Sequence, residues 1–207
     1  MTRIVAGAAG GRRLEVPRSG TRPTSERVRE ALFSRLEAYG VLQGARVLDL
    51  CAGSGALGLE AASRGAAEVT LVDAARPAVA VCRRNLRALG LRGVSAVCAR
   101  VETYLAGPAG AGMDLVLLDP PYDVSEEALT AMLTPLARGG PDPWLAPDAV
   151  VVVERSSRSP EPTWPEGLAR FAEKRYGETV LHLATRPLAE SGTSEPPRAV
   201  ALNQRER

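Results

Sequence analysis

The stretch that decides the fold is Val47–Gly58, which reads Val-Leu-Asp-Leu-Cys-Ala-Gly-Ser-Gly-Ala-Leu-Gly. A short apolar strand leads into a glycine-rich turn, and the residues after the turn fit the start of a helix. Asp73 ends the next predicted strand, about 20 residues further on. Glycines permit a tight turn and a close approach of a ligand to the backbone, and an acid at the second position can hold ribose hydroxyls. The stretch therefore predicts a strand–turn–helix unit that binds a nucleoside cofactor.

The same alternation of strands and helices continues outward from this unit. Short, nearly continuous apolar strands separated by amphipathic helices predict a parallel sheet covered on both faces. We therefore expect an α/β fold with a doubly wound, Rossmann-like sheet. Residues 171–185, with Gly177 and Glu178 in the middle, predict a closing antiparallel hairpin. The expected strands cover 47–50, 69–72, 94–98, 115–118 and 149–153, and the expected helices cover 55–64, 77–89, 102–105 and 125–137.

An N-terminal extension, residues 1–45, precedes the core, residues 46–186. Segments 2–6 and 12–16 flank a glycine-rich stretch and predict a small hairpin. Thr24 is the expected N-cap of a following helix that ends near Gly40. Residues 187–207 are polar and contain few apolar side chains, so we expect a disordered tail. The helix of the extension would present one apolar face, made of Val28, Leu32, Leu36 and Tyr39.

Composition narrows the class of protein. The chain of 207 residues is 45% hydrophobic and 24% charged, as in an ordinary globular protein of one domain. No apolar run approaches the roughly 18 residues of a membrane span, and the first residues do not resemble a secretory signal. We therefore expect a cytoplasmic monomer that has no contact with membranes. Three cysteines and a single histidine argue against a disulfide framework, a metal site and a Ser/His/Asp triad.

Positive charge is concentrated at the N-terminus. Residues 1–35 contain eight Arg against three Glu, whereas the rest of the chain has a small excess of acids. The planar guanidinium of Arg suits phosphate contacts and stacking on bases, so the extension predicts a surface that faces nucleic acid. An Arg-rich composition imposed by a GC-rich genome is the plainer alternative, and some of these side chains could pair with Glu26 and Glu30. The candidates for phosphate contacts are Arg12, Arg13, Arg18, Arg22, Arg27 and Arg29.

Electrostatics separates two cofactor classes that the glycine loop would suit. The spacing Gly53-x-Gly55-x-x-Gly58 also matches the dinucleotide pattern of NAD-dependent enzymes. A pyrophosphate needs a helix N-terminus without nearby negative charge, and Asp49 at the entry to the loop opposes it. S-adenosylmethionine has no phosphate, and an aspartate offsets the charge of its ammonium and sulfonium. We therefore expect S-adenosylmethionine, with a glycine turn that binds nothing as the simpler alternative.

The reaction motif is Asp119-Pro120-Pro121-Tyr122, which follows a predicted strand and therefore lies at the carboxyl edge of the sheet. An exocyclic amine is a poor nucleophile because its lone pair is delocalised into the ring. The carboxylate of Asp119 and the carbonyl oxygen of Pro120 would accept hydrogen bonds from the two N–H groups of the amine, which favours the geometry that attack requires. The two prolines would hold that carbonyl in place. Tyr122 can stack on the base. The motif predicts transfer of a methyl group from sulfur to nitrogen, unless it is only a strand-ending turn.

Taken together, these features resemble the RsmD family. The resemblance spans residues 1–186 and implies an S-adenosylmethionine-dependent methyltransferase of the class I fold that acts on guanine N2 of 16S ribosomal RNA, free or in an assembling small subunit. It also implies cofactor contacts from the loop residues Asp49, Ala52, Gly53, Ser54 and Gly55, from Asp73, and from the backbone of Val101. The residues that carry it are Arg3-Ile4-Val5-x-Gly7, Arg22-Pro23-Thr24, Arg27-Val28-Arg29-Glu30, Asp49–Gly58, Asp73 and Asp119–Tyr122.

Other functions keep part of this pattern. A DNA adenine-N6 or cytosine-N4 methyltransferase would use the same chemistry, but such enzymes usually need more mass to read and flip a base than the extension supplies. A C5-cytosine methyltransferase would need a nucleophilic cysteine beside a proline, which this chain lacks. A glutamine methyltransferase more often starts its motif with Asn. A non-catalytic RNA-binding module would explain the basic extension but has no need of Asp49 and Asp119.

Overall fold

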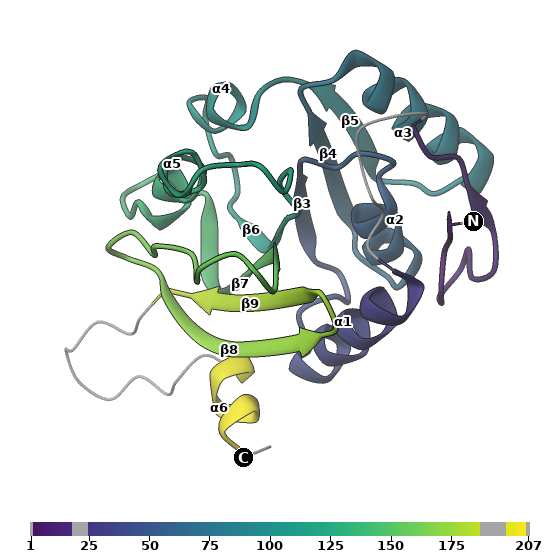
Figure 1. The fold of residues 1–207 in the computed structure, drawn as a ribbon. Helices are drawn as coiled ribbons and strands as arrows, with labels where there is room; N and C mark the ends of the chain where they lie inside the picture. Colours follow the sequence, from purple (N-terminus) through teal and green to yellow (C-terminus); the bar gives the residue numbers. More distant parts are fainter. Residues whose placement is uncertain (1, 18–24, 187–197, 206–207) are drawn as a thin grey trace.

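A seven-stranded sheet forms the centre of the protein in the computed structural model, which describes residues 2–17, 25–186 and 198–205 (Figure 1). The strand order is β5-β4-β3-β6-β7-β9-β8. Strands β3 to β7 run parallel, and β9 pairs antiparallel with both β7 and β8. The predicted α/β sheet and its closing hairpin are confirmed. The strands are β3 (Arg46–Leu50), β4 (Glu68–Asp73), β5 (Val94–Cys98), β6 (Met113–Leu118), β7 (Leu145–Ser156), β8 (Ala169–Tyr176) and β9 (Thr179–Thr185).

Helices cover both faces of the sheet, because successive residues of a buried parallel strand point to opposite sides. In β3, Val47 packs with α1 and α2, whereas Leu48 packs with α4 and α5. The two faces therefore have separate hydrophobic clusters. The helices are α1 (Glu26–Tyr39), α2 (Ala56–Ser63), α3 (Arg76–Leu89), α4 (Val101–Leu105), α5 (Glu126–Ala137) and α6 (Arg198–Arg205).

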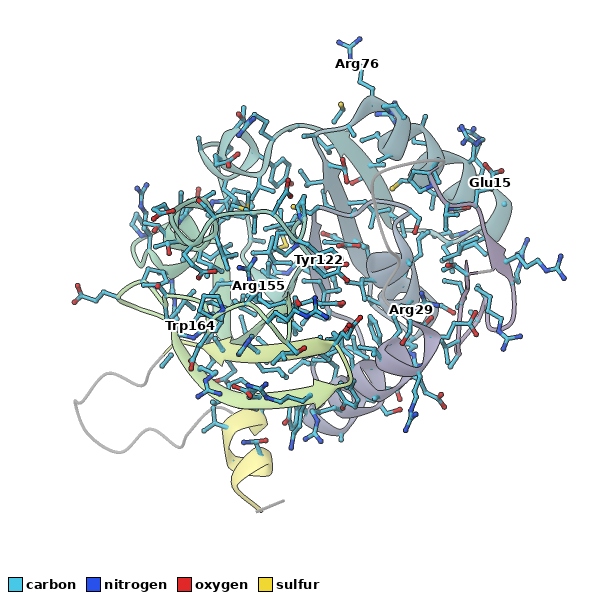
Figure 2. All side chains as sticks on the ribbon, viewed as in Figure 1. Glu15, Arg29, Arg76, Tyr122, Arg155 and Trp164 are labelled. Atoms are coloured by element: carbon cyan, nitrogen blue, oxygen red, sulfur yellow. The ribbon has the colours of Figure 1, made fainter. Side chains whose placement is uncertain are left out.

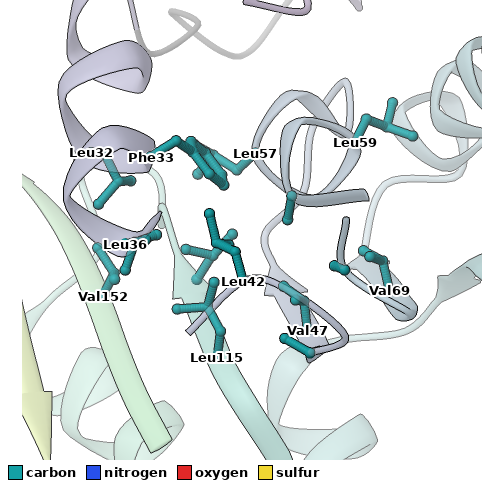
Figure 3. Packing of buried hydrophobic residues seen from close by; sticks show 14 of the residues in the cluster. Leu32, Phe33, Leu36, Leu42, Val47, Leu57, Leu59, Val69, Leu115 and Val152 are labelled. Atoms are coloured by element: carbon teal, nitrogen blue, oxygen red, sulfur yellow. The ribbon is translucent and has the colours of Figure 1, made fainter. Parts of the chain in front are cut away.

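The helix of the N-terminal extension belongs to the core. Figure 3 shows Leu32, Phe33 and Leu36 of α1 pointing toward α2 and toward the sheet, and all three side chains are at most 1% exposed. Burial of each such side chain stabilises the fold by about 1.5–3 kcal/mol relative to leaving it exposed. The predicted helix is confirmed, but its cap is Ser25, whose Oγ accepts a hydrogen bond from the amide of Val28. Thr24, the predicted cap, lies outside the described residues.

The predicted N-terminal hairpin is confirmed as β1 (Thr2–Arg3) and β2 (Arg13–Leu14), which pair antiparallel. The loop between them is hydrogen-bonded to side chains and backbone of α2. The buried carboxylate of Glu60 accepts hydrogen bonds from the backbone amides of Val5 (2.7 Å) and Ala6 (3.0 Å). Ser63 accepts from two further amides of the loop through its Oγ and its carbonyl oxygen. These bonds fix the hairpin on the helix that follows the glycine loop.

The chain end differs from the expected disordered tail, because residues 198–205 form α6. Ala199 and Asn203 of α6 are buried. Asn203 accepts a hydrogen bond from the hydroxyl of Tyr39 and donates one to the carbonyl oxygen of Phe171. Residues 187–197 lie outside the described part of the chain. Of the helices described in the structure, none combines the length and the apolar content needed to cross a membrane.

Gly7 should be the least replaceable glycine of the hairpin loop. Its φ is +81°, and a Cβ there would lie 1.9 Å from the carbonyl oxygen of Ser63. Gly11 has nearly the same φ, +80°, but a Cβ there would meet nothing within 4 Å. We expect Gly7→Ala to lower the free energy of unfolding by about 3 kcal/mol or more, and Gly11→Ala by about 1 kcal/mol, which is the cost of the left-handed backbone alone. Urea unfolding measures both, and equal losses would contradict the contact with Ser63.

Candidate cofactor and substrate site

A cavity of about 690 Å³ opens at the carboxyl edge of the parallel strands. The chain order reverses between β3 and β6, which are neighbours in the sheet, so the loops after these two strands diverge there. Open α/β sheets bind their ligands at this topological switch point. Residues from five parts of the chain line the cavity: Val16 and Pro17; Asp49, Cys51–Ser54, Ala56 and Leu57; Asp73–Ala75, Pro77 and Ala78; Arg100–Glu102; and Asp119–Asp123 with Met132.

The three glycines of the loop between β3 and α2 serve two purposes. Gly53 and Gly55 have φ of +58° and +79°, which turn the chain sharply into the helix. Gly58 lies in the first turn of α2, where a Cβ would approach the Cδ2 of Leu71 to 2.3 Å. A side chain at position 58 would therefore push α2 away from the sheet.

Asp73 at the end of β4 ties two loops of the cavity together. One carboxylate oxygen accepts a hydrogen bond from the amide of Gly53 and the other accepts one from the amide of Ala75, both at 2.8 Å. Each oxygen of a carboxylate has two lone pairs, so both can accept a further hydrogen bond. Asp73 can thus hold the glycine loop and a ligand hydroxyl at the same time.

Asp49 is buried beneath the glycine loop. Its side chain is on the α2 face of β3 and accepts a hydrogen bond from the amide of Gly58 at 2.8 Å. Burial raises the pKa of Asp49 to about 8, the charges of Asp119 and Asp73 add to that rise, and the Gly58 amide opposes it. A cation in the cavity would favour the ionised carboxylate and reverse part of this shift.

The cavity has a strongly negative character. Burial raises the pKa of the Cys51 thiol to about 12, and the charges of Asp73, Asp49, Asp119 and Glu102 raise it further. Such a thiol stays protonated and is a weak nucleophile. In the described residues, no group of three or more His, Cys, Asp or Glu side chains could hold a metal ion. The negative charges around the cavity favour a cationic ligand.

The loop Asp119–Tyr122 leaves β6, the strand next to β3, and lines the same cavity as the glycine loop. Pro120 is buried, whereas Tyr122, labelled in Figure 2, is 57% exposed and lines the cavity. The carbonyl oxygen of Pro121 accepts a hydrogen bond from the amide of Val124, and Ser125 then caps α5. An exposed aromatic ring beside a cavity is available to stack on a planar ligand.

The buried side chain of Arg155 on β7 forms an ion pair at 2.5 Å with Glu126 in the first turn of α5, the helix that follows this loop. This ion pair holds the end of the reaction loop against the sheet.

The structure places nearly all the predicted cofactor and reaction residues around one cavity. Gly55 is the exception, because it shapes the turn without lining the cavity. Sequence reasoning missed Val16 and Pro17, which come from the N-terminal extension, as well as Glu102 and Asp123. Glu102 and Asp123 stand next to residues that the motifs had singled out, whereas no sequence signal pointed to Val16.

The predicted phosphate contacts need one correction. Arg29 is fully buried, its guanidinium donates to the carbonyl oxygen of Arg3, and burial lowers its pKa (Figure 2). A phosphate cannot reach it, so Arg29 supports the fold. Arg12, Arg13 and Arg27 are exposed, although Arg12 also donates to carbonyl oxygens at the end of α3. Arg18 and Arg22 lie outside the described residues.

Comparison with known proteins shows one family. Residues 2–185 match the family described as Conserved hypothetical protein 95. The chain is 37% identical over 185 residues to the Ribosomal RNA small subunit methyltransferase D of Escherichia coli strain K12, which covers 89% of each chain. It is 33% identical to the Putative rRNA methyltransferase YlbH of Bacillus subtilis, over 86% of this chain and 95% of that protein.

The solved structure of the putative methyltransferase yhhF from Escherichia coli is similar as well. It has a TM-score of 0.76 and 37% identity, and the match covers 89% of this chain and 97% of that one. The sequence matches and this fold agree over nearly the whole described chain. This protein therefore belongs to the RsmD family, whose model spans both the N-terminal extension and the sheet.

Proposed function

We propose that this protein transfers the methyl group of S-adenosylmethionine to the exocyclic N2 amine of a guanine in 16S ribosomal RNA. The observation that carries the proposal is that the glycine loop and Asp119–Tyr122 line the same cavity. A cofactor on the loop and an amine on the motif would therefore meet. The names of the relatives from Escherichia coli and Bacillus subtilis support ribosomal RNA as the substrate class.

The negative cavity favours S-adenosylmethionine over a dinucleotide. The amide of Gly58, in the first turn of α2, is already bonded to Asp49, and a pyrophosphate there would face the charges of Asp73 and Asp119. Bound S-adenosylmethionine supplies an electrophilic methyl group on a positively charged sulfur. Asp49, Ala52, Gly53, Ser54, Asp73 and Val101 are the residues that would hold it.

The reaction loop has the groups that an exocyclic amine needs. The carboxylate of Asp119 and the carbonyl oxygen of Pro120 would accept its two N–H groups, which directs the nitrogen lone pair toward the methyl group. The exposed ring of Tyr122 would stack on the base. The exposed Arg13 and Arg27, together with Arg12, would contact phosphates of the RNA.

The direct test is to incubate the protein with labelled S-adenosylmethionine and, separately, unmodified 16S RNA, small ribosomal subunits and duplex DNA. Mass spectrometry then identifies the methylated nucleoside. We expect N2-methylguanine from RNA or subunits. Methylated adenine or cytosine from DNA, with ribosomal RNA unlabelled, would contradict the substrate while leaving the role of Asp119 intact.

Asp119→Ala should separate chemistry from cofactor binding. It removes an acceptor used chiefly by the reacting amine, so we expect kcat to fall by about 10²-fold or more while the Kd for S-adenosylmethionine stays within about threefold. Asp114→Asn is the matched control, because Asp114 lies on the same strand but bonds to Arg46 outside the cavity. Undiminished turnover by Asp119→Ala would refute the assigned role.

Cofactor binding should release a proton from Asp49. With a pKa of about 8, the carboxyl group of the empty protein is mostly protonated at pH 7, and a bound cation favours its ionised form. Affinity should therefore rise with pH between about 6 and 8. Calorimetry in buffers of different ionisation enthalpy should find about one more proton released at pH 7 by the wild type than by Asp49→Asn. Equal proton release by both proteins would rule out the titration of Asp49.

A further inference from the structure

We propose that Asn85 on α3 is a positioning residue that makes the segment Glu15–Pro17 of the N-terminal extension a wall of the cofactor pocket. This inference rests on the proposed function, because it assigns a role in binding S-adenosylmethionine. It makes the affinity for the cofactor depend on a segment that lies outside the sheet and its cofactor loop.

The side-chain amide of Asn85 forms hydrogen bonds both to the N-terminal extension, at Glu15, and to the cofactor loop, at Ser54. Its Nδ2 donates to the carbonyl oxygens of Glu15 and Ser54, both at 2.9 Å, and its Oδ1 accepts from the amide of Glu15 at 2.8 Å. The side chain is only 2% exposed. An amide has two donor hydrogens and an acceptor oxygen, so these three bonds use both of its functional ends. A carboxylate of the same shape could accept from Glu15 but could not donate to Ser54.

The segment held by Asn85 leads directly into the cavity. Val16 and Pro17 follow Glu15 and line the same cavity as the cofactor loop. Val16 is 44% exposed, and Tyr122 is the other large hydrophobic residue in the described chain with such exposure. Both line the same cavity. When a bound ligand covers an apolar side chain that was exposed to water, the free energy of the complex is lowered.

Two other contacts fasten the extension to α3 without involving the cofactor loop. Arg84 pairs with the side chain of Glu15 at 2.7 Å on the surface, and Arg12 donates to the carbonyl oxygen of Leu89 at 2.9 Å. Asn85 differs from Arg84 because its amide also reaches Ser54. The structure thus offers a neighbouring contact that attaches the same segment but is separate from the loop.

The test is a double-mutant cycle with Asn85→Leu and Val16→Ala, read out by calorimetric titration with S-adenosylmethionine. Asn85→Leu leaves the Glu15 and Ser54 groups without this partner, and we expect the Kd to rise about tenfold, with kcat at saturating cofactor within about twofold. Val16→Ala alters no buried group, so it leaves the fold intact and should raise the Kd about threefold. If Asn85 acts through the wall, Val16→Ala should have almost no further effect in the Asn85→Leu background.

Arg84→Met is the control, because it removes only the exposed ion pair and should leave the Kd within about twofold. Strictly additive effects of the two main variants, or an unchanged Kd for Val16→Ala alone, would overturn the inference. So would an equal loss of affinity in Arg84→Met, since the general attachment of the extension would then be responsible. A wild-type chain that binds no S-adenosylmethionine would overturn the proposed function as well, whereas tight wild-type binding unchanged by Asn85→Leu would overturn this inference alone.

Discussion

The rest of the site depends on the hydrogen bond from the amide of Gly58 to the buried carboxylate of Asp49. This bond joins the central strand to the first turn of α2, and it forms at 2.8 Å because Gly58 lets the helix pack close to Leu71. The glycine loop spans the short distance between these two fixed points. Burial makes the ionised form of Asp49 costly, and a cation bound in the cavity would offset that cost, so the acid that orders the loop also favours a cationic ligand.

The N-terminal extension is anchored to the helices that pack around the glycine loop. It is bonded to Glu60 on α2 and to Asn85 on α3, the two helices that flank the glycine loop. The family match begins at residue 2 and so includes this extension, whereas α6 lies beyond its end at residue 185. An extension that was only an RNA-binding attachment would not need to line the cofactor cavity with Val16.

The helices and strands that could be predicted from the sequence are those whose signals lie in neighbouring residues. Apolar strands, helical periodicity and glycines such as Gly90 at the end of α3 depend on neighbouring residues, and the structure confirms those elements. The errors concern contacts between distant residues. Asn203 docks on Tyr39 and Phe171, which polar composition near the chain end could not reveal. Arg29 was grouped with exposed arginines because composition does not show which side of α1 is buried.

The acceptor groups of the reaction loop do not by themselves select a substrate. A carboxylate, a carbonyl oxygen and an aromatic ring suit any planar exocyclic amine, so discrimination among nucleic acids must come from surfaces around the cavity. In this chain the exposed Arg13 and Arg27 belong to the extension that also supplies a wall of the cavity. Binding of RNA to that extension would therefore act on the same segment that lines the cavity. Under the proposed function, substrate choice and cofactor binding would share one structural element, which follows from how the extension is anchored rather than from the reaction motif.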